Sequence, residues 1–449
     1  MKRAFLLSCL LMSALLLLPD AYAGGRGPRG RKARIRQLSE ENAALRAKLD
    51  SLLSLRADSV SVGNVPADEA LAEEVPVRAD SLAASPSDSD SEVEELDTVR
   101  FTSNVSDEEM MRRLAAINSY ISLPFNGTVK NYMILYAERM PRNMSVLLGR
   151  SEYYFPIFEE AFARYGLPLE LKYLAVVESH LNPVAESKAG ALGIWQFMYR
   201  TGKLFGLRIN SFVDERLDVE KASDAAARYL RDAYAAFGDW NLAICSYNCG
   251  SGNVRKAISR AGGSRDFWSI YPYLPNETRG YVPAFVGAMY AFTYAREYGI
   301  QPAETELPAV TDTFMIHRNL HFRQVSEVVG VPLNTVKQLN PQYTHDIVPG
   351  NEGPCVLRLP EEWTAAMMEA DADSLYAHRA ADLLNPQVIK NIQESGAEVR
   401  VAYKVKSGDC LGVIAKRNGV SVAQIKKWNH LRSDTIRPGQ ILYIYRREK

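Results

Sequence analysis

One glutamate, Glu178, stands at the end of an apolar helical run within AVVESHLNPVAESKAGALGIWQF, residues 175–197. A carboxyl group there faces the negative end of the helix dipole, and Val176, Val177 and Trp195 would desolvate it. Both effects raise a carboxyl pKa, which suits a general acid near neutral pH. A surface glutamate in a last helical turn fits the same position, so other segments must decide between the two interpretations.

Three segments combine aromatic residues, amides and glycines: residues 187–197 (SKAGALGIWQF), 246–253 (SYNCGSGN) and 274–284 (LPNETRGYVPA). Small residues let the backbone approach a sugar ring closely. We expect Trp195 to offer a stacking face and Gln196 a bidentate amide. Each segment alone is weak evidence for a saccharide site.

In this order, residues 150–300 resemble family 1 lytic transglycosylases, lysozyme-like enzymes that cleave the glycan strands of peptidoglycan. The motifs that carry the resemblance are E-S at Glu178-Ser179 with N-P at Asn182-Pro183, G-x-W-Q-F at Gly193–Phe197, Y-N-x-G-x-G at Tyr247–Gly252, and E-T-R-x-Y-V-P at Glu277–Pro283. The resemblance does not extend to residues 24–100.

The resemblance implies why one carboxylate suffices. Most glycosidases pair an acid with a base or nucleophile. In this family one glutamate protonates the MurNAc–GlcNAc bond and then acts as base on the MurNAc C6 hydroxyl, which closes a 1,6-anhydro ring without water. Carried over, Glu178 is the acid/base.

The other positions that match the family's motifs are expected to serve the substrate. Glu277 is equally consistent with a helix cap, and Ser179 with steadying Glu178. Tyr281 is expected to contact or orient Glu178. The substrate-binding set is Ser179, Gln196, Tyr247, Asn248, Glu277 and Tyr281.

Helices must position these residues, because residues 105–300 show helical spacing and no strand-like alternation. Phe155, Phe158, Phe162 and Tyr165 form one stripe, expected to be core. A break at Gly166–Pro168 precedes the helix that carries Glu178, and that helix should stop before Asn182-Pro183. Further core helices are expected at 219–237 and 281–298.

The C-terminal third contains an internal β-α-α-β repeat. The first repeat, residues 311–360, has strands near 314–316 and 355–359 and helices at 322–329 and 333–339. The second repeat, residues 401–447, has two alternating strands around two short helices. Residues 361–400 are expected to connect them, mostly as helix.

The second repeat resembles a LysM domain, through Val405, Gly408-Asp409, Leu411, Ile414-Ala415, Asn429 and Gly439-Gln440. The resemblance implies that Asp409, Leu411 and Asn429 contact GlcNAc, although Leu411 fits packing nearly as well. Cys410 departs from the usual Ser or Thr and is a weaker hydrogen-bond donor. The first repeat lacks the Gly-Asp pair, so we expect it to pack against the catalytic domain without holding sugar.

The N-terminal hundred residues contain three features. Residues 1–23 have a basic start, an apolar run and an A-x-A site, as in a cleaved export signal. A lipobox-like Leu6–Cys9 leaves a lipoprotein with membrane proximity as an alternative. Residues 24–56 include a heptad helix over 32–56 with Asn42 at an a position, consistent with weak self-association or with a merely amphipathic helix. Residues 57–104 read as an acidic disordered linker.

Composition excludes little, but it favours no nucleic-acid partner, because Lys+Arg and Asp+Glu both number 53. Four cysteines remain after signal cleavage, Cys245, Cys249, Cys355 and Cys410, and we expect all to be small buried residues. No cluster has the spacing of a metal site, and no cofactor is expected.

The fold class expected is mainly α, with a lysozyme-like catalytic domain at 105–305 and small βααβ modules. The function expected is a periplasmic or outer-membrane-associated peptidoglycan lytic transglycosylase. A hydrolytic muramidase or chitinase-like glycosidase, and an inactive wall-binding scaffold, remain as alternatives.

Overall fold

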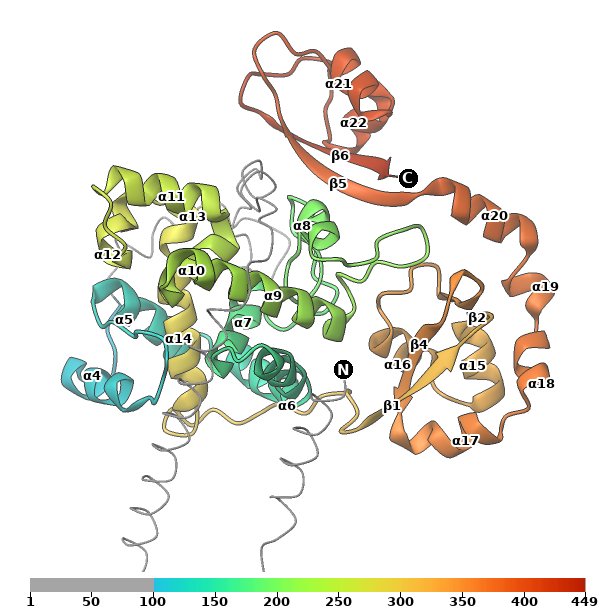
Figure 1. Ribbon diagram of the computed structural model, residues 1–449, viewed down its shortest axis with the longest axis horizontal. Helices are drawn as coiled ribbons and strands as arrows, with labels where there is room; N and C mark the ends of the chain where they lie inside the picture. The colour runs from blue at the N-terminus through green and yellow to red at the C-terminus, as the bar shows by residue number, and fades with distance from the viewer. Residues whose placement is uncertain (1–100, 449) are drawn as a thin grey trace, which may run out of the picture. The chain divides into compact units, whose positions relative to one another are not determined.

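The computed structural model describes residues 101–448, shown as coloured ribbon in Figure 1. The export signal at 1–23, the heptad helix at 32–56 and all but the last residues of the 57–104 linker lie outside the described residues. These three remain predictions.

Residues 101–309 are helical, as the aromatic spacing predicts (Figure 1). The α-helices are α4 (Asp107–Ala116), α5 (Gly127–Ile134), α6 (Pro141–Arg164), α7 (Tyr173–Ser179), α8 (Tyr199–Leu204), α9 (Val219–Phe237), α10 (Trp240–Cys249), α11 (Ser251–Arg260), α12 (Phe267–Ile270), α13 (Asn276–Arg279) and α14 (Tyr281–Thr293). A π-helical turn at Leu135–Arg139 and 3₁₀ turns at Leu169–Lys172 and Tyr271–Tyr273 join some of them.

Helix boundaries follow local chemistry. The helix predicted at 219–237 is α9, which Asp218 caps by accepting the Glu220 and Lys221 N–H groups, and which ends at left-handed Gly238. The helix predicted to reach residue 298 ends earlier, because α14 stops at Thr293 and turns follow it.

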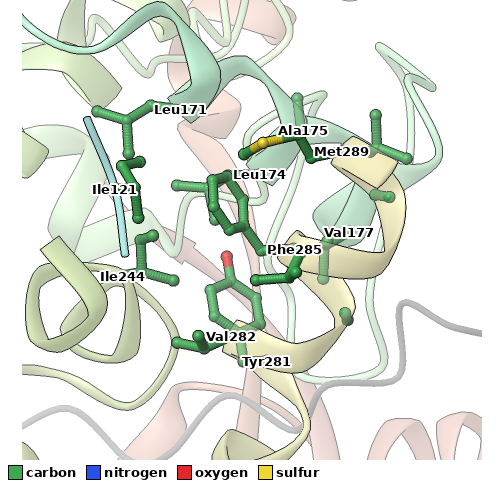
Figure 2. Close-up of a cluster of buried hydrophobic side chains, with 14 of the residues drawn as sticks. Ile121, Leu171, Leu174, Ala175, Val177, Ile244, Tyr281, Val282, Phe285 and Met289 are labelled. Atoms are coloured by element: carbon green, nitrogen blue, oxygen red, sulfur yellow. The ribbon is translucent and has the colours of Figure 1, made fainter. Parts of the chain in front are cut away.

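The core of the helical domain forms where α14 packs against α5, α7 and α10. Figure 2 shows part of it, with Leu174 and Val177 of α7 beside Phe285 and Met289 of α14. The predicted aromatic stripe lines α6, where Phe158 and Phe162 are fully buried. Each such side chain contributes roughly 1.5–3 kcal/mol by leaving water, so α7 rests on a rigid support.

The first repeat is a β-α-α-β unit with an additional short pair of antiparallel strands. Its elements are β1 (Thr311–Ile316), β2 (Asn319–His321), α15 (Phe322–Val329), α16 (Leu333–Leu339), β3 (Ile347–Pro349) and β4 (Cys355–Pro360). Strands β1 and β4 pair antiparallel, as do β2 and β3. Both helices lie where the sequence predicts them. Phe212 and Val213 of the catalytic domain join this repeat's apolar core.

The connector is helical, and the second repeat follows it. The connector contains α17 (Thr364–Glu369), α18 (Ala372–Ala377), α19 (Ala380–Leu383) and α20 (Pro386–Ser395), and the repeat contains β5 (Ala397–Lys404), α21 (Leu411–Asn418), α22 (Val422–Trp428) and β6 (Ile441–Glu448). Strands β5 and β6 pair antiparallel. Within residues 101–448, no helix has both the length and the apolar composition needed to cross a bilayer.

The expectation that all four cysteines are buried is wrong for one of them. Cys245, Cys249 and Cys355 are buried thiols, whereas Cys410 is exposed. Cys410 occupies the N-cap of α21, a position that precedes the first helical turn and faces solvent.

Candidate active site

Helix α7 ends in a strained turn immediately after Glu178. The His180 N–H donates to the Val176 carbonyl (3.0 Å) and the Leu181 N–H to the Ala175 carbonyl (3.4 Å), so two carbonyls of the last helical turn have partners. His180 and Leu181 are both left-handed, with φ of 51° and 56°. Glycine usually takes such positions, and other residues there cost of order 1–3 kcal/mol each. The turn holds Glu178 in the last turn of its helix.

The Glu178 carboxyl group is buried against a single phenol. The residue is 8% exposed, and Tyr281 at the start of α14 donates a hydrogen bond to its Oε1. Burial raises the pKa of Glu178 to about 8, against the opposing effect of the Tyr281 hydrogen bond. Glu178 is therefore mostly protonated at neutral pH, as a general acid requires.

Two tyrosines surround this carboxyl group. Burial raises the pKa of Tyr247 and of Tyr281 well above 10, and the neighbouring Glu178 carboxylate raises both further. Both phenols therefore stay protonated and act as donors. Tyr247 donates to the Trp195 carbonyl (2.8 Å). Figure 2 shows the Tyr281 ring among apolar side chains that include Val282.

Ser179 links the end of α7 to the segment that bears Gln196, residues 185–197, here called the Gln196 loop. Its Oγ lies 3.1 Å from the Ala175 carbonyl oxygen and 2.8 Å from that of Ile194. It also accepts the Asn182 N–H (3.3 Å). The structure therefore places Ser179 as a tie between Glu178 and this loop.

The side-chain amide N–H groups of Gln196 donate within its own loop. Its Nε2 donates to the carbonyls of Ala185 (3.0 Å) and Gly193 (2.8 Å). The residue itself is left-handed, with φ of 49°. A sugar contact through this side chain must therefore use Oε1, so the expected bidentate amide is not available.

Asn248 and Glu277 lie at the junction of α10 and α13. The Oδ1 atom of Asn248 accepts the Thr278 hydroxyl (2.8 Å), and both residues are buried. Thr278 belongs to the E-T-R motif, so the signal for this contact was in the sequence. Glu277 is half-buried in the first turn of α13, where the helix dipole stabilises a carboxylate. Both interpretations of Glu277 stay open.

The expected stacking face of Trp195 is wrong. Trp195 is 0% exposed, its Nε1–H donates to Ser223 Oγ (2.8 Å), and its ring meets Phe158 and Phe162 edge-on. The indole is therefore a core side chain, and it packs the Gln196 loop against α6 and α9. The carbonyl of Trp195 accepts the Tyr247 hydroxyl, and its ring meets the Tyr247 ring edge-on.

The small residue Gly193 also has a different role from the one expected. Its φ is 86°, and a Cβ there would lie 1.9 Å from the Arg216 carbonyl oxygen. Glycine is required because the protein's own backbone passes at this point, whatever binds nearby.

Comparison with known proteins agrees with this geometry. Residues 155–269 match the transglycosylase SLT domain, residues 403–444 the LysM domain, and residues 310–377 the LysM-like domain of lytic transglycosylase MltD. Membrane-bound lytic murein transglycosylase D of Escherichia coli K12 is 30% identical over 328 residues, which cover 72% of this chain and 70% of that protein.

The chain belongs to the lytic murein transglycosylase D family. Other relatives match a shorter part of the chain. Peptidoglycan transglycosylase gp16 of phage T7 is 37% identical over 120 residues, 26% of this chain and 9% of that protein. Membrane-bound lytic murein transglycosylase F of Photobacterium profundum is 30% identical over 128 residues, 25% of this chain and 24% of that protein. This family member is therefore a peptidoglycan lytic transglycosylase, and its SLT and LysM domains bind peptidoglycan.

In the family's LysM portion, the structure places Asp409 and Leu411 in internal contacts. Asp409 Oδ2 accepts the Tyr403 hydroxyl and the Lys406 N–H, both at 2.8 Å. The hydrogen bond from the Lys406 N–H and, to a smaller extent, the one from the Tyr403 hydroxyl hold the pKa of Asp409 below its usual value. Leu411 is 2% exposed and lies in the apolar core of the second repeat. Their predicted contacts with GlcNAc stay predictions.

Asn429 is also used inside the second repeat. Its Nδ2 donates to the carbonyls of Ile425 (2.9 Å) and Tyr443 (2.7 Å), and its Oδ1 accepts the Tyr443 N–H (2.7 Å). These bonds tie α22 to β6. A sugar contact by Asn429 also stays a prediction.

A pocket of about 770 Å³ lies away from this chemistry. Its lining includes Tyr120, Glu170, Lys172, Tyr234 and Trp240, and none of the predicted site residues. The pocket therefore does not include the buried carboxyl group of Glu178, and the candidate site is defined by geometry and burial at Glu178. Among residues 101–448, no group of three or more His, Cys, Asp or Glu side chains is placed to hold a metal ion.

Proposed function

We propose that Glu178 is the sole acid and base of a non-hydrolytic cleavage of the MurNAc-β-1,4-GlcNAc bond. The observation that supports this most strongly is the buried carboxyl group, whose pKa is raised to about 8 and whose Oε1 accepts the Tyr281 hydroxyl. A carboxyl group in this state can donate a proton at neutral pH and recover it within the same cycle.

The proposed cycle has two steps. Protonated Glu178 gives its proton to the glycosidic oxygen, and the bond from MurNAc C1 to that oxygen breaks, which releases the GlcNAc 4-hydroxyl. The Glu178 carboxylate then takes the proton of the MurNAc C6 hydroxyl while O6 bonds to C1. A 1,6-anhydro ring forms, the glutamate is again protonated, and no water is consumed.

Tyr281 is proposed to orient the carboxyl group in both states. Its hydroxyl can donate to the carbonyl oxygen of the acid form and, more strongly, to the carboxylate. Because this bond favours the carboxylate, it also limits how far burial raises the Glu178 pKa.

The remaining predicted residues divide by the groups that they have available. We propose that Gln196, through Oε1, and Tyr247, through its ring, contact the saccharide. Ser179 and Asn248 are proposed to hold the site, since the Ser179 Oγ and the Asn248 Oδ1 already bond within the protein. Glu277 is proposed as either a contact or a helix cap.

The decisive experiment is digestion of purified peptidoglycan by wild type and by Glu178→Gln, with products identified by mass spectrometry. Wild type should release fragments ending in 1,6-anhydroMurNAc. Glu178→Gln should lower the rate by at least ~10²–10⁴. Exposed Glu152 on α6 provides the matched control, because Glu152→Gln should leave the rate unchanged.

Each alternative has its own signature in this digest. Reducing MurNAc ends without anhydro products would identify a hydrolytic muramidase. An unchanged rate in Glu178→Gln would transfer the chemistry to another residue. Binding without any product from wild type would identify an inactive scaffold.

For the C-terminal third, we propose that the second repeat holds GlcNAc-containing glycan and that the first does not. The exposure of Gly408 and Cys410 supports this for the second repeat. Titration of the full chain with chitin oligosaccharides, before and after Gly408→Trp, tests it. Retained affinity in the variant would contradict the assignment.

For the N-terminus, we propose export by the signal at residues 1–23 and delivery to the periplasm or outer membrane. The relative from E. coli is described as membrane-bound. Intact mass of the exported protein decides between a chain that begins at Gly24 and one acylated at Cys9.

A further inference from the structure

A buried arginine, Arg216, lies beneath the Gln196 loop and outside every motif identified above. It is 4% exposed and follows α8 in a non-helical segment, residues 208–217, here called the Arg216 segment. Its Nε and Nη2 form a fork on buried Asp214, with contacts of 3.0 Å to Oδ1 and 2.7 Å to Oδ2. The fixed fork of a guanidinium suits such a bidentate pair.

The remaining donor of Arg216 holds both ends of the loop's tip. Its Nη1 donates to the Gly190 carbonyl (3.2 Å) and to the Phe197 carbonyl (3.3 Å). Its own carbonyl lies against Gly193 so closely that no Cβ would fit there. Arg216 therefore contacts the loop at three points, Gly190, Gly193 and Phe197.

The Gln196 loop connects Arg216 to the neighbours of Glu178. The Ile194 carbonyl contacts Ser179, the residue next to Glu178. The Trp195 carbonyl accepts the Tyr247 hydroxyl, and Gln196 sits at the loop's left-handed turn. A shift of the loop would therefore move three groups of the site together.

The first repeat holds the other side of the Arg216 segment. The Asp214 N–H donates to the Gln342 carbonyl (2.9 Å), and the Thr344 N–H donates to the Phe212 carbonyl (2.9 Å). Thr344 Oγ1 donates to the Ser211 carbonyl (2.7 Å), and Phe212 is 1% exposed in the repeat's apolar core. The Arg216 segment is thus bonded to the Gln196 loop on one side, through Arg216, and to the first repeat on the other.

We propose that Arg216, held by Asp214, is a positioning residue for the transglycosylase site, and that the first repeat supports it by anchoring Phe212–Asp214. The first repeat acts through the catalytic loop rather than through a sugar of its own. The activity readout rests on the proposed role of Glu178, whereas the loop's conformation can be measured independently of it.

The test compares Arg216→Lys with wild type in the full chain. Lysine keeps the positive charge but cannot bond Asp214 and two carbonyls at once. We expect kcat/KM on soluble glycan fragments to fall roughly 10–100-fold. We also expect amide hydrogen exchange at Ala191, Gly193 and Phe197 to accelerate, at a temperature where circular dichroism shows the variant folded.

Arg228 supplies the matched control. It likewise bridges an aspartate and a carbonyl, with 2.9 Å to Asp224 Oδ2 and 2.6 Å to the Phe205 oxygen, but it does not touch the Gln196 loop. Arg228→Lys should leave kcat/KM and loop exchange unchanged. Equal losses in both variants would show a general structural role and would overturn the proposal.

The contribution of the first repeat is tested by a double-mutant cycle. Thr344→Val removes one anchoring bond with little change of shape, and Phe212→Ala removes the apolar anchor. If the repeat acts through Arg216, the losses in kcat/KM from Phe212→Ala and Arg216→Lys should be less than multiplicative. Multiplicative losses, or wild-type loop exchange in Thr344→Val and Phe212→Ala, would contradict the coupling.

Failure of this proposal is distinguishable from failure of the Glu178 assignment. Anhydro products lost in Glu178→Gln but retained at wild-type rate in Arg216→Lys would reject the positioning role alone. Unchanged activity in Glu178→Gln would reject the acid/base assignment, while loop exchange would still report on Arg216.

Discussion

The Glu178 site and the second repeat each hold a carboxyl group in hydrogen bonds, but with opposite effects on its pKa. Glu178 is buried with one phenol as partner, and the pKa of its carboxyl group rises to about 8. Asp409, by contrast, accepts a backbone N–H and a tyrosine hydroxyl, and its pKa falls. Burial with a single donor raises the pKa of a carboxyl group, whereas several donors and a nearby arginine, Arg417 at 3.3 Å from Asp409, lower it.

The two repeats extend this contrast. Asn340 in the first repeat donates to the Val336 and Arg358 carbonyls and accepts the Arg358 N–H. Asn429 makes the same three bonds in the second repeat. An asparagine that recurs with identical bonds, in a repeat expected to hold sugar and in one that is not, is a device for joining the second helix to the last strand.

The turn before the first helix differs between the repeats. In the second repeat Gly408 and Cys410 are exposed. In the first, Arg318 lies over the Tyr376 ring (4.3 Å) and Gln324 donates to the Tyr376 carbonyl, so the connector covers this region. The difference supports glycan binding by the second repeat and a supporting role for the first.

The largest effect expected from the difference between Glu178 and Asp409 is on the free energy of unfolding. Because the folded pKa of Glu178, about 8, exceeds its ordinary value of 4.5, this group's stability contribution is complete below about pH 4.5 and is lost as pH rises through 8. Glu178→Gln has no carboxyl group to ionise at this position, so the variant does not lose stability as the pH rises. We expect the variant to exceed wild type in free energy of unfolding by roughly 2–4 kcal/mol at pH 8, and to match it near pH 4.

Denaturant titrations at both pH values measure this difference. The control is Asp409→Asn in the second repeat, which should be less stable than wild type at neutral pH, because a lowered pKa stabilises the charged form. A stability gain in both variants would erase the distinction between the two regions.

The next effect concerns the one hydrogen bond that Glu178 retains. Tyr281→Phe removes a bond that favours the carboxylate, so the Glu178 pKa should rise and the alkaline limb of kcat/KM should move to higher pH. A hydrogen bond to a charged group is worth about 1.5–3 kcal/mol, so turnover should fall roughly 10–100-fold. Tyr290→Phe, on the same helix and bonded to Tyr298, should keep the wild-type profile. If the alkaline limb does not shift in Tyr281→Phe, the Tyr281 hydroxyl does not affect the pKa of the catalytic group.

A smaller effect is expected from the shared asparagine. Asn429→Ala removes the side-chain partner of the Tyr443 N–H and carbonyl, at a cost of about 1–3 kcal/mol to the second repeat. Calorimetry should show a lower transition for this repeat, and turnover of soluble fragments should be unchanged. Asn340→Ala should destabilise the first repeat similarly but also reduce turnover, because that repeat anchors Phe212. Equal turnover in the two variants would weaken this distinction.

The smallest effect lies at the departure from the LysM pattern. Cys410 is the N-cap of α21 and makes no side-chain capping bond, whereas Ser421 caps α22. Cys410→Ser should stabilise the second repeat by about 0.5–1 kcal/mol, and Ser421→Ala should destabilise it by about 1 kcal/mol. Thermal unfolding measures both. No gain in Cys410→Ser would indicate that the turn geometry prevents capping.

Much of the architecture follows from local pattern. The helix at 219–237 and those at 322–329 and 333–339 lie at their predicted positions, because caps, prolines and apolar spacing act over a few residues. The mainly α fold and the contact between Tyr281 and Glu178 agree with the family resemblance of the motifs. The roles of Trp195 and Gly193 did not follow, since packing against distant residues decides them.

The order of motifs was enough to single out Glu178 and to indicate a reaction, because residue types and their sequence spacing are properties of the chain. Burial, donor count and the neighbours of a loop depend on segments far apart in sequence, and only folding brings these together. That is why Arg216 carried no signal beforehand, and why the Glu178 pKa and the grip of the first repeat on residues 212–214 were decided by tertiary structure.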